Sequence, residues 1–254
     1  MLSKSELKHL RSLKQAKFRQ MYDIFVAEGD KLVSDLILKG TFEIEAIYCL
    51  ENWFTEKSNL LNDYSSIVFK VTNSEMEEIS LLSTPSSVYI LLKRTNDEVN
   101  AKLIQLGSSF LVDGVQDPGN LGTIIRIADW FGFKAVIRTR DSADFFNPKT
   151  IQSSMGSICN IHLCTIDRNE ISNLPPSLPL VGVDVSGVSV HLAATPEKAI
   201  YVLGSEGRGI SAEIKASIQS FISIPGSKSK FAESLNVAVS SGIIAQWVSV
   251  NPNK

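Results

Sequence analysis

Three loops rich in glycine and polar residues carry the side chains whose types could do chemistry. The first runs from Asp113 to Gly122 and leads into an apolar segment that carries Arg126. The second is Gly-Ser-Glu-Gly-Arg-Gly at 204–209, and the third spans 224–238. Each loop follows a short apolar run that is expected to form a strand. Ligands of open α/β sheets bind outside the carboxyl ends of the strands, so these loops are the predicted ligand site.

Several polar side chains in these loops have two interpretations. Asn120 stands at an expected helix start, where it would serve as an N-cap or contact a ligand. Arg126 lies among isoleucines and therefore needs a partner or an interface. Glu206, expected to be a buried loop carboxylate, would be a general base or a backbone anchor. Ser234 and Asn236 mark another helix start and could also hold a ligand.

Other kinds of site are poorly supported. The glycines at 204, 207 and 209 lie at offsets zero, three and five, whereas the dinucleotide fingerprint needs zero, two and five. No Gly-Lys-Ser/Thr follows, as a phosphate loop would require. His9, His162 and His191 are scattered outside the three loops, which disfavours a Ser-His-Asp hydrolase and a metal centre. We therefore expect no metal site.

Length and composition indicate a folded chain in a reducing compartment. The 254 residues suit one large or two ordinary domains, and 44% hydrophobic residues suffice for a core. No apolar run reaches the length of a membrane helix, and residues 1–10 lack a signal-peptide pattern. Three cysteines are too few for a disulfide framework and are expected to be small buried thiols. The default expectation is a cytoplasmic protein without membrane contact.

The near-neutral net charge of −2 hides an uneven distribution. Residues 1–20 hold six basic residues and one acidic residue, a net charge of +5, whereas residues 21–100 carry −8. Spacings of three and four residues predict that Lys4, Lys8, Arg11 and Arg19 share one face of a single helix. That face is either a solvated helix surface or a surface that contacts phosphates.

Alternating strands and helices predict two α/β units. We expect a first domain at 1–95, a linker at 96–106 and a second domain at 107–254. In the first domain the expected strands are 25–27, 46–50, 67–71 and 88–92, with helices at 31–39 and from Asn73. In the second domain the expected strands are 110–112, 134–138, 180–183, 199–203 and 221–224, with helices at 120–131, 149–155, 211–218 and 234–248.

Taken in order, the three loops resemble the signature motifs of the SpoU (TrmH-type) RNA ribose 2′-O-methyltransferases. The matching segments are 117–126, 202–210, and Ile224-Pro225 with 233–239. The resemblance covers roughly residues 107–250. The first domain, through residues 17–19 and 25–29, resembles the ribosomal-protein-like RNA-binding domain of two-domain members of this family.

This resemblance implies more than the alternation of elements does, since alternation alone suggests an open Rossmann-like sheet. Family members tie the C-terminal part of a helix-flanked parallel sheet into a deep trefoil knot, bind S-adenosylmethionine bent within it, and act as homodimers. Matched by position, the catalytic and RNA-facing residues would be Asn120, Arg126, Glu206 and Asn236, with Arg126 near the partner subunit's cofactor. The cofactor-binding residues would be Leu203, Gly204, Ser205, Gly207, Ile224, Pro225, Ser234 and Leu235.

The implied reaction is attack of a ribose 2′-hydroxyl on the methyl group of the donor. Because an arginine pKa above about 12 makes proton abstraction costly, we expect Arg126 to position phosphate and hydroxyl. The loop between Pro225 and Ser234 is longer than is usual in the family and adds Lys228 and Lys230. Ribosomal RNA is the expected substrate and transfer RNA the alternative. The rival functions are a non-catalytic RNA-binding protein and a nucleotide-dependent oxidoreductase.

Overall fold

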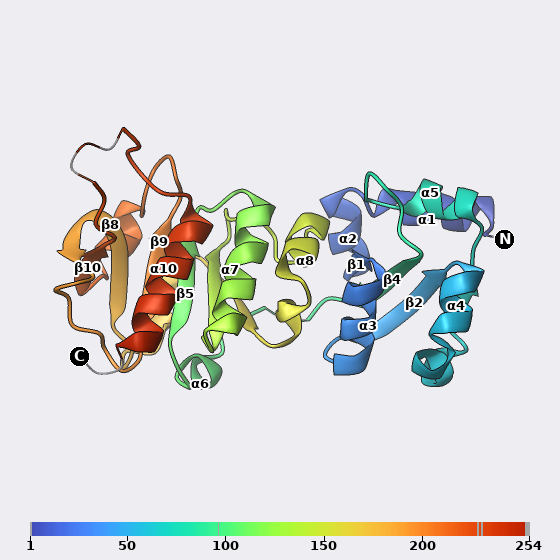
Figure 1. Ribbon diagram of the computed structural model, residues 1–254, viewed down its shortest axis with the longest axis horizontal. Coiled ribbons are helices and arrows are strands. Elements are labelled where there is room, and N and C mark those ends of the chain that lie inside the picture. The colour runs from blue at the N-terminus through green and yellow to red at the C-terminus, as the bar shows by residue number, and fades with distance from the viewer. Residues whose placement is uncertain (1, 96, 228, 230, 252–254) are drawn as a thin grey trace. The chain divides into compact units, whose positions relative to one another are not determined.

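The computed structural model describes residues 2–95, 97–227, 229 and 231–251, so Lys228 and Lys230 lie outside the described residues. The chain divides into two compact units, each with its own sheet (Figure 1). Residues 2–95 form the first unit together with Phe146–Cys159, and Asp97–Phe145 with residues 160–251 form the second. The expected domain limits of 1–95 and 107–254 stay a prediction.

The first unit is built on a mixed four-stranded sheet in the order β1-β4-β2-β3. The neighbours of β4 are antiparallel to it, whereas β2 and β3 are parallel. Ile24, Val26, Tyr89 and Leu91 from the paired β1 and β4 belong to its core. The strands are β1 (Ile24–Glu28), β2 (Ile44–Cys49), β3 (Val68–Lys70) and β4 (Val88–Lys93). The helices are α1 (Lys4–Ser12), α2 (Ala16–Tyr22), α3 (Asp30–Lys39), α4 (Glu51–Glu56) and α5 (Asn73–Ile79), with a 3-10 helix at Ser58–Tyr64.

The basic N-terminal segment is two helices, so the expectation of one continuous helix was wrong. Helix α1 (Lys4–Ser12) begins with a capping box between Ser3 and Glu6, and α2 (Ala16–Tyr22) begins after an extended Gln15. The buried guanidinium of Arg19 donates to the carbonyl oxygens of residues 13 and 14 at 2.7 and 3.1 Å. Arg19 thus satisfies carbonyls at the end of α1 and is not on an exposed basic face.

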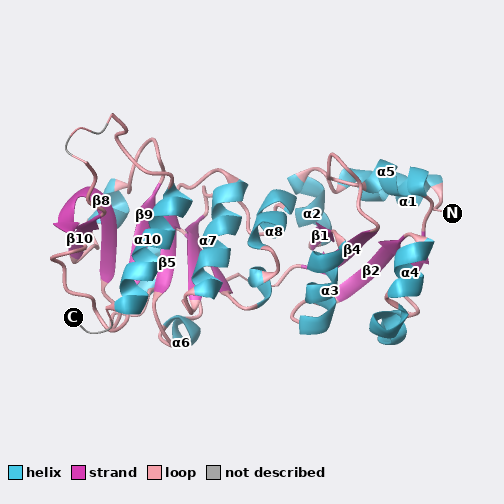
Figure 2. Cartoon of the chain, in the orientation of Figure 1, coloured by secondary structure: helices cyan, strands magenta, loops and turns pink. Residues whose placement is uncertain are grey.

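The second unit contains a six-stranded sheet in which every pairing is parallel, in the order β10-β8-β9-β5-β6-β7. Figure 2 shows its strands β10, β8, β9 and β5 together with helices α10 and α7. This confirms an α/β fold with a parallel sheet flanked by helices. The strands are β5 (Ser109–Asp113), β6 (Ala135–Thr139), β7 (His162–Ile166), β8 (Leu180–Ser189), β9 (Ile200–Gly204) and β10 (Ser220–Ser223). The helices are α6 (Ala101–Ile104), α7 (Pro118–Trp130), α9 (Ala212–Lys215) and α10 (Val237–Val250), with a 3-10 helix at Arg168–Asn173.

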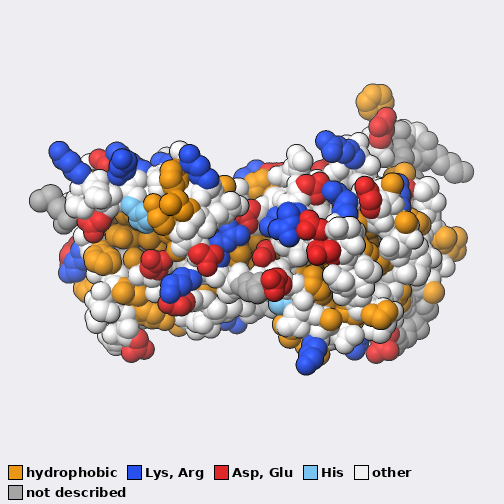
Figure 3. Space-filling model, turned by 180° about the vertical axis from the view of Figure 1, so that it is seen from behind, with side chains coloured by type: hydrophobic (Ala, Val, Ile, Leu, Met, Phe, Trp, Pro, Cys, Tyr) orange, Lys and Arg blue, Asp and Glu red, His pale blue; other side chains and the backbone are white. Residues whose placement is uncertain are grey.

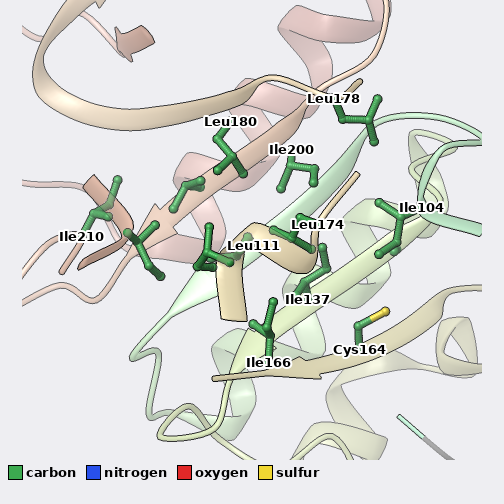
Figure 4. Close-up of a cluster of buried hydrophobic side chains, with 14 residues drawn as sticks. Ile104, Leu111, Ile137, Cys164, Ile166, Leu174, Leu178, Leu180, Ile200 and Ile210 are labelled. Atoms are coloured by element: carbon green, nitrogen blue, oxygen red, sulfur yellow. The ribbon is translucent and has the colours of Figure 1, made fainter. Parts of the chain in front are cut away.

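Near-continuous apolar strands supply the core of the second unit, as is typical of a parallel sheet covered on both faces. Leu111, Ile137 and Ile200 from three adjacent strands belong to one buried cluster (Figure 4). The ring of Phe110 on β5 stacks on that of Phe133, which precedes β6, with centroids 4.3 Å apart. These contacts fix the strands whose carboxyl ends carry the three loops.

Five local expectations need correction. Helix α7 begins at Pro118 with Asp117 as its N-cap, so Asn120 lies inside the first turn rather than capping it. Thr72, not Asn73, caps α5. The last helix begins at Val237 and not at 234, and α9 ends at Lys215, before residue 218. The strand β7 was missed because its half-buried His162 and Thr165 weaken the apolar run.

Segment Phe146–Cys159 belongs to the first unit although the sequence places it among the elements of the second. It contains α8 (Pro148–Ser154) and a 3-10 helix at Ser157–Cys159. The ring of Phe146 lies 5.0 Å from that of Phe25 on β1 and 6.4 Å from that of Phe42. The core of the first unit is thus completed by residues far along the chain.

Cys49 and Cys164 are buried thiols. Burial raises the pKa of the Cys164 thiol to about 12. Cys159 is half-buried, so the expectation of buried thiols was wrong for this residue. Within the described ranges, none of the helices is long and apolar enough to cross a membrane.

Candidate active site

The three motif loops meet at one edge of the second sheet. Strands β5 and β9 are paired in parallel up to Asp113 and Gly204, and the loops leave from their carboxyl ends. The third loop follows β10 and ends at Asn236, the N-cap of α10. The parallel topology therefore gathers residues that are more than 100 positions apart in the sequence.

A chain of hydrogen bonds joins one residue from each loop. The side-chain amide of Asn236 donates to Oδ1 of Asn120 at 3.1 Å. The amide of Asn120 donates in turn to Oε1 of Glu206 at 2.8 Å. Three of the four expected catalytic residues are thus brought together within one chain. Glu206 is exposed, so the expectation of a buried carboxylate was wrong.

The cap of helix α10 fixes the direction of this chain. Oδ1 of Asn236 accepts hydrogen bonds from the backbone amides of Ala238 and Val239, at 2.9 and 3.2 Å. Since the oxygen is engaged there, the Asn236 nitrogen must face Asn120 as a donor. Asn120 then presents its oxygen to Asn236 and its nitrogen to Glu206. The helix cap therefore fixes the direction of both hydrogen bonds, from Asn236 to Asn120 and from Asn120 to Glu206.

Arg126 is placed differently from the other three expected catalytic residues. It lies two turns into α7 and is exposed. Its side chain has no hydrogen-bond or ion-pair partner within the described part of the chain, and it lines neither cavity of the site. Arg126 is exposed while Ile124, Ile125 and Ala128 beside it are buried, so the expected partner of Arg126 is not found within the described residues of this chain.

A cavity of about 640 Å³ lies beside the hydrogen-bonded chain. Its volume is within the range of small-molecule sites. Gly207, expected among the cofactor-binding residues, does not line it and lies at a neighbouring cavity instead. The expected residues that do line it are Leu203, Gly204, Ser205, Ile224, Pro225, Ser234 and Leu235.

Gly204 is required by the close passage of two backbone segments. A Cβ atom at this position would lie 2.2 Å from the carbonyl carbon of Gly209 and 2.4 Å from the nitrogen of Ile210. Such distances are incompatible with any side chain. The loop closes on itself through a bridge between Ser205 and Gly209, which brings backbone rather than side chains to the wall of the cavity.

Asp184 adds a charge to the cavity that sequence reasoning missed. It lies on β8, where pairing with β10 shifts register, and lines the cavity with Val183 and Val185. The backbone amide of Ser186, joined by its hydroxyl, donates to Asp184 and lowers the pKa of this carboxyl. Asp184 therefore presents a carboxylate to the cavity at neutral pH.

A second group of residues, which the sequence analysis also missed, anchors the end of the loop that carries Glu206. Arg168 donates to Oδ1 of the buried Asp113 at 2.6 and 2.9 Å, to Asp141 at 2.8 Å and to the Ser211 hydroxyl at 3.1 Å. Oδ2 of Asp113 accepts from the Ser211 backbone amide at 2.6 Å. Arg168 follows β7, the strand that the sequence analysis missed. Recognising that strand would have indicated Arg168 as a polar residue at the carboxyl end of a strand. These residues border a second cavity of about 460 Å³.

The expected RNA-facing residues of the first unit are only partly available. Lys4 and Lys8 are exposed on α1. Arg11 is also exposed but forms an ion pair with Glu78 at 2.5 Å. Arg19 is buried, so its expected role in contacting RNA is wrong.

Family models match both units of the chain. The model of the SpoU rRNA Methylase family matches residues 108–246, and that of the MRM3-like substrate binding domain matches residues 4–89. The first match covers more than half of the chain and contains all three motif loops. The chain therefore belongs to the SpoU rRNA methylase family. This family defines it as an RNA methyltransferase with an added substrate-binding domain.

Relatives and solved structures share this organisation over nearly the whole chain. The 23S rRNA (guanosine(2553)-2′-O)-methyltransferase RlmP of Bacillus subtilis is 28% identical over 249 residues, 94% of each chain. A putative RNA methyltransferase of the TrmH family from Porphyromonas gingivalis is 34% identical, with a TM-score of 0.86 over 98% of each chain. An AdoMet-bound rRNA methyltransferase from Sinorhizobium meliloti shares the fold at 24% identity, with a TM-score of 0.85 over 98% of this chain and 95% of that one.

Proposed function

We propose that this protein transfers a methyl group from S-adenosylmethionine to a ribose 2′-hydroxyl of RNA. The observation that carries the proposal is the hydrogen-bonded chain Asn236–Asn120–Glu206 beside a cavity of about 640 Å³. When bound, the donor supplies an electrophilic methyl group on a sulfonium. The protein's part is to hold the hydroxyl in line with that methyl, which contributes several kcal/mol to lowering the barrier.

The residues of the larger cavity fit S-adenosylmethionine. Leu203, Ile224 and Leu235 offer apolar contacts for an adenine ring. The Asp184 carboxylate complements a positively charged methyl donor. The bare backbone at Gly204 allows hydrogen bonding without a side chain in the way. Calorimetric titration with S-adenosylmethionine tests this assignment, and absence of binding would leave the rival function of a non-catalytic RNA-binding protein.

The hydrogen-bonded chain orients the acceptor. Asn120 and Asn236 are locked in one amide orientation by the cap of α10, so they hold Glu206 in a fixed position. Glu206 keeps a second carboxylate oxygen with which to accept the ribose hydroxyl. Arg126, supplied from a second copy, positions phosphate and hydroxyl as a planar, permanently charged fork. These roles follow the sequence-based expectation and stay proposals.

We propose a homodimer formed through α7 and α10. These helices pack closely, and a Cβ at Gly242 would lie 3.6 Å from the Ile127 side chain. Trp130 on α7 is 84% exposed, and Val239 on α10 is 52% exposed. Such apolar exposure beside the unpartnered Arg126 suits a second copy of this chain. Light scattering tests the dimer, and Ile243→Glu on the same helix should yield a monomer.

The knot expected from the family resemblance is also a proposal. It is supported by the match of the SpoU rRNA Methylase family model to residues 108–246. Tracing the chain in an experimental electron-density map would decide whether the segment after β10 passes through the loop before it.

Ribosomal RNA is the proposed substrate, with transfer RNA as the alternative. The full-length relative from Bacillus subtilis is named for 23S rRNA, and the substrate-binding domain model matches the first unit. Mapping 2′-O-methyl sites in ribosomal and transfer RNA from a deletion strain tests the assignment. A site lost only from transfer RNA would select the alternative. A cytoplasmic location remains the expectation from the sequence.

A further inference from the structure

We infer that an aromatic–lysine cluster on α1 and α2, made of His9, Lys17, Phe18 and Tyr22, binds unstacked bases of a single-stranded RNA segment. The inference rests on the proposed function, since it gives the first unit a specific role in holding the RNA. It differs from the expected basic helix face, whose Arg19 is buried. None of the four residues belongs to the site on the second unit.

The rings of the cluster form a continuous platform. Tyr22 stacks on Phe18 with ring centroids 6.5 Å apart and planes within 16° of parallel. His9 meets Tyr22 edge-on, with centroids 4.6 Å apart. Phe18 is partly buried against the core of the first unit, which anchors the platform, whereas Tyr22 is 43% exposed. A half-exposed ring fixed by two others is preorganised for stacking.

The electrostatic surroundings favour a polyanion. Between positions 8 and 22 the chain has no Asp or Glu. Lys8, Lys14 and Lys17 are exposed, and their amino groups have no hydrogen-bond or ion-pair partner within the described residues. The Lys17 amino group lies 4.8 Å from the centre of the Phe18 ring, so positive charge sits directly at the platform. Basic side chains gather along one edge of this unit beside hydrophobic ones (Figure 3).

The acidic remainder of the first unit limits where RNA can approach. Within the first unit, residues 21–95 carry a net charge of −6, which repels phosphates. On α1 and α2, lysines with no ion-pair partner among the described residues lie beside an exposed aromatic ring, whereas Lys70, next to the exposed Phe69 of β3, is already paired with Glu51. Duplex RNA keeps its bases stacked and offers them no access to a ring, whereas loops and single strands do. The chemistry of the cluster thus selects single-stranded RNA.

The test measures binding of full-length protein to a fluorescently labelled mixed-sequence RNA of about 12 nucleotides, and to the duplex of the same sequence. Tyr22→Ala is expected to weaken single-strand binding about tenfold with an unchanged salt slope, because it removes stacking but no charge. Tyr22→Phe keeps the ring and should bind as the unaltered protein does. Lys17→Ala should lower the slope of log K against log salt by about 0.7.

Leu38→Ala is the matched control, since Leu38 is 73% exposed on α3 and lies outside the cluster. Circular dichroism confirms that each variant is folded. Unchanged single-strand binding by Tyr22→Ala, or an equal loss for duplex and single strand, overturns the inference. Methyl transfer is measured separately. If the protein methylates RNA but Tyr22→Ala does not weaken single-strand binding, only the role of the aromatic–lysine cluster is refuted. If Tyr22→Ala weakens single-strand binding but the unaltered protein does not methylate RNA, only the proposed function is refuted.

Discussion

Asn236 donates from Nδ2 to Oδ1 of Asn120 while its own Oδ1 caps helix α10. One side chain therefore caps the N-terminus of helix α10 and also sets the orientation of Asn120, a proposed catalytic residue. The two tasks use different atoms, and substitution can separate them.

Asn236→Asp and Asn236→Ala form the first matched pair. Aspartate keeps the capping oxygen but cannot donate to Asn120, so we expect the free energy of unfolding to be kept and methyl transfer to fall at least about tenfold. Alanine loses both tasks and should also cost about 1 kcal/mol of stability. Urea unfolding and single-turnover transfer measure the two effects. Full activity of the aspartate variant would show that the donated hydrogen bond is irrelevant.

Arg126→Lys tests the planar fork of the guanidinium. Lysine keeps the charge but cannot make a bidentate contact, so turnover should fall about tenfold or more, equivalent to about 1.4 kcal/mol. Because Arg126 is exposed, the free energy of unfolding should stay within about 0.5 kcal/mol. Near-normal turnover in a steady-state assay would refute the positioning role.

Gly204→Ala is expected to weaken binding of S-adenosylmethionine about tenfold or more. The added methyl would lie 2.2 Å from the backbone of Gly209, so the loop must move, at a cost of about 1–3 kcal/mol. Gly207→Ala is the control in the same loop, because its Cβ meets nothing within 4 Å. Calorimetry on both variants decides the matter, and equal donor affinity would exclude the close passage as the cause.

Removal of residues 1–96 should leave a fragment that binds the methyl donor but methylates RNA poorly. The fragment retains Phe146 and Ile151, which are buried in the intact chain and lose Phe25 and its neighbours as packing partners. We therefore expect it to bind the dye ANS, which reports exposed apolar surface. Phe146→Ser within the fragment should reduce that binding. Normal RNA methylation by the fragment would refute a delivery role for the first unit.

Periodicity and apolar runs were sufficient to predict most strands and the α/β class, because parallel strands buried on both faces need continuous apolar sequence. The three motifs were sufficient to locate most residues of the larger cavity. Local pattern could not reveal that Arg19 turns inward, since its acceptors are carbonyls of the preceding helix. Nor could it place Phe146–Cys159 in the first unit or link Arg168 to Asp113, because both depend on contacts between distant segments.

The hydrogen bond between Asn236 and Asn120 also determines the effect of chemical damage at Asn236. Deamidation of Asn236 yields isoaspartate and aspartate, and the molecules that receive aspartate would be the aspartate variant. The helix cap would survive, so the damaged molecule would remain folded and would escape the quality control that recognises unfolding. Abundance measurements would count it as intact. Each molecule would then lose activity before it is degraded. Mass spectrometry of residue 236 measures the fraction of molecules in that state.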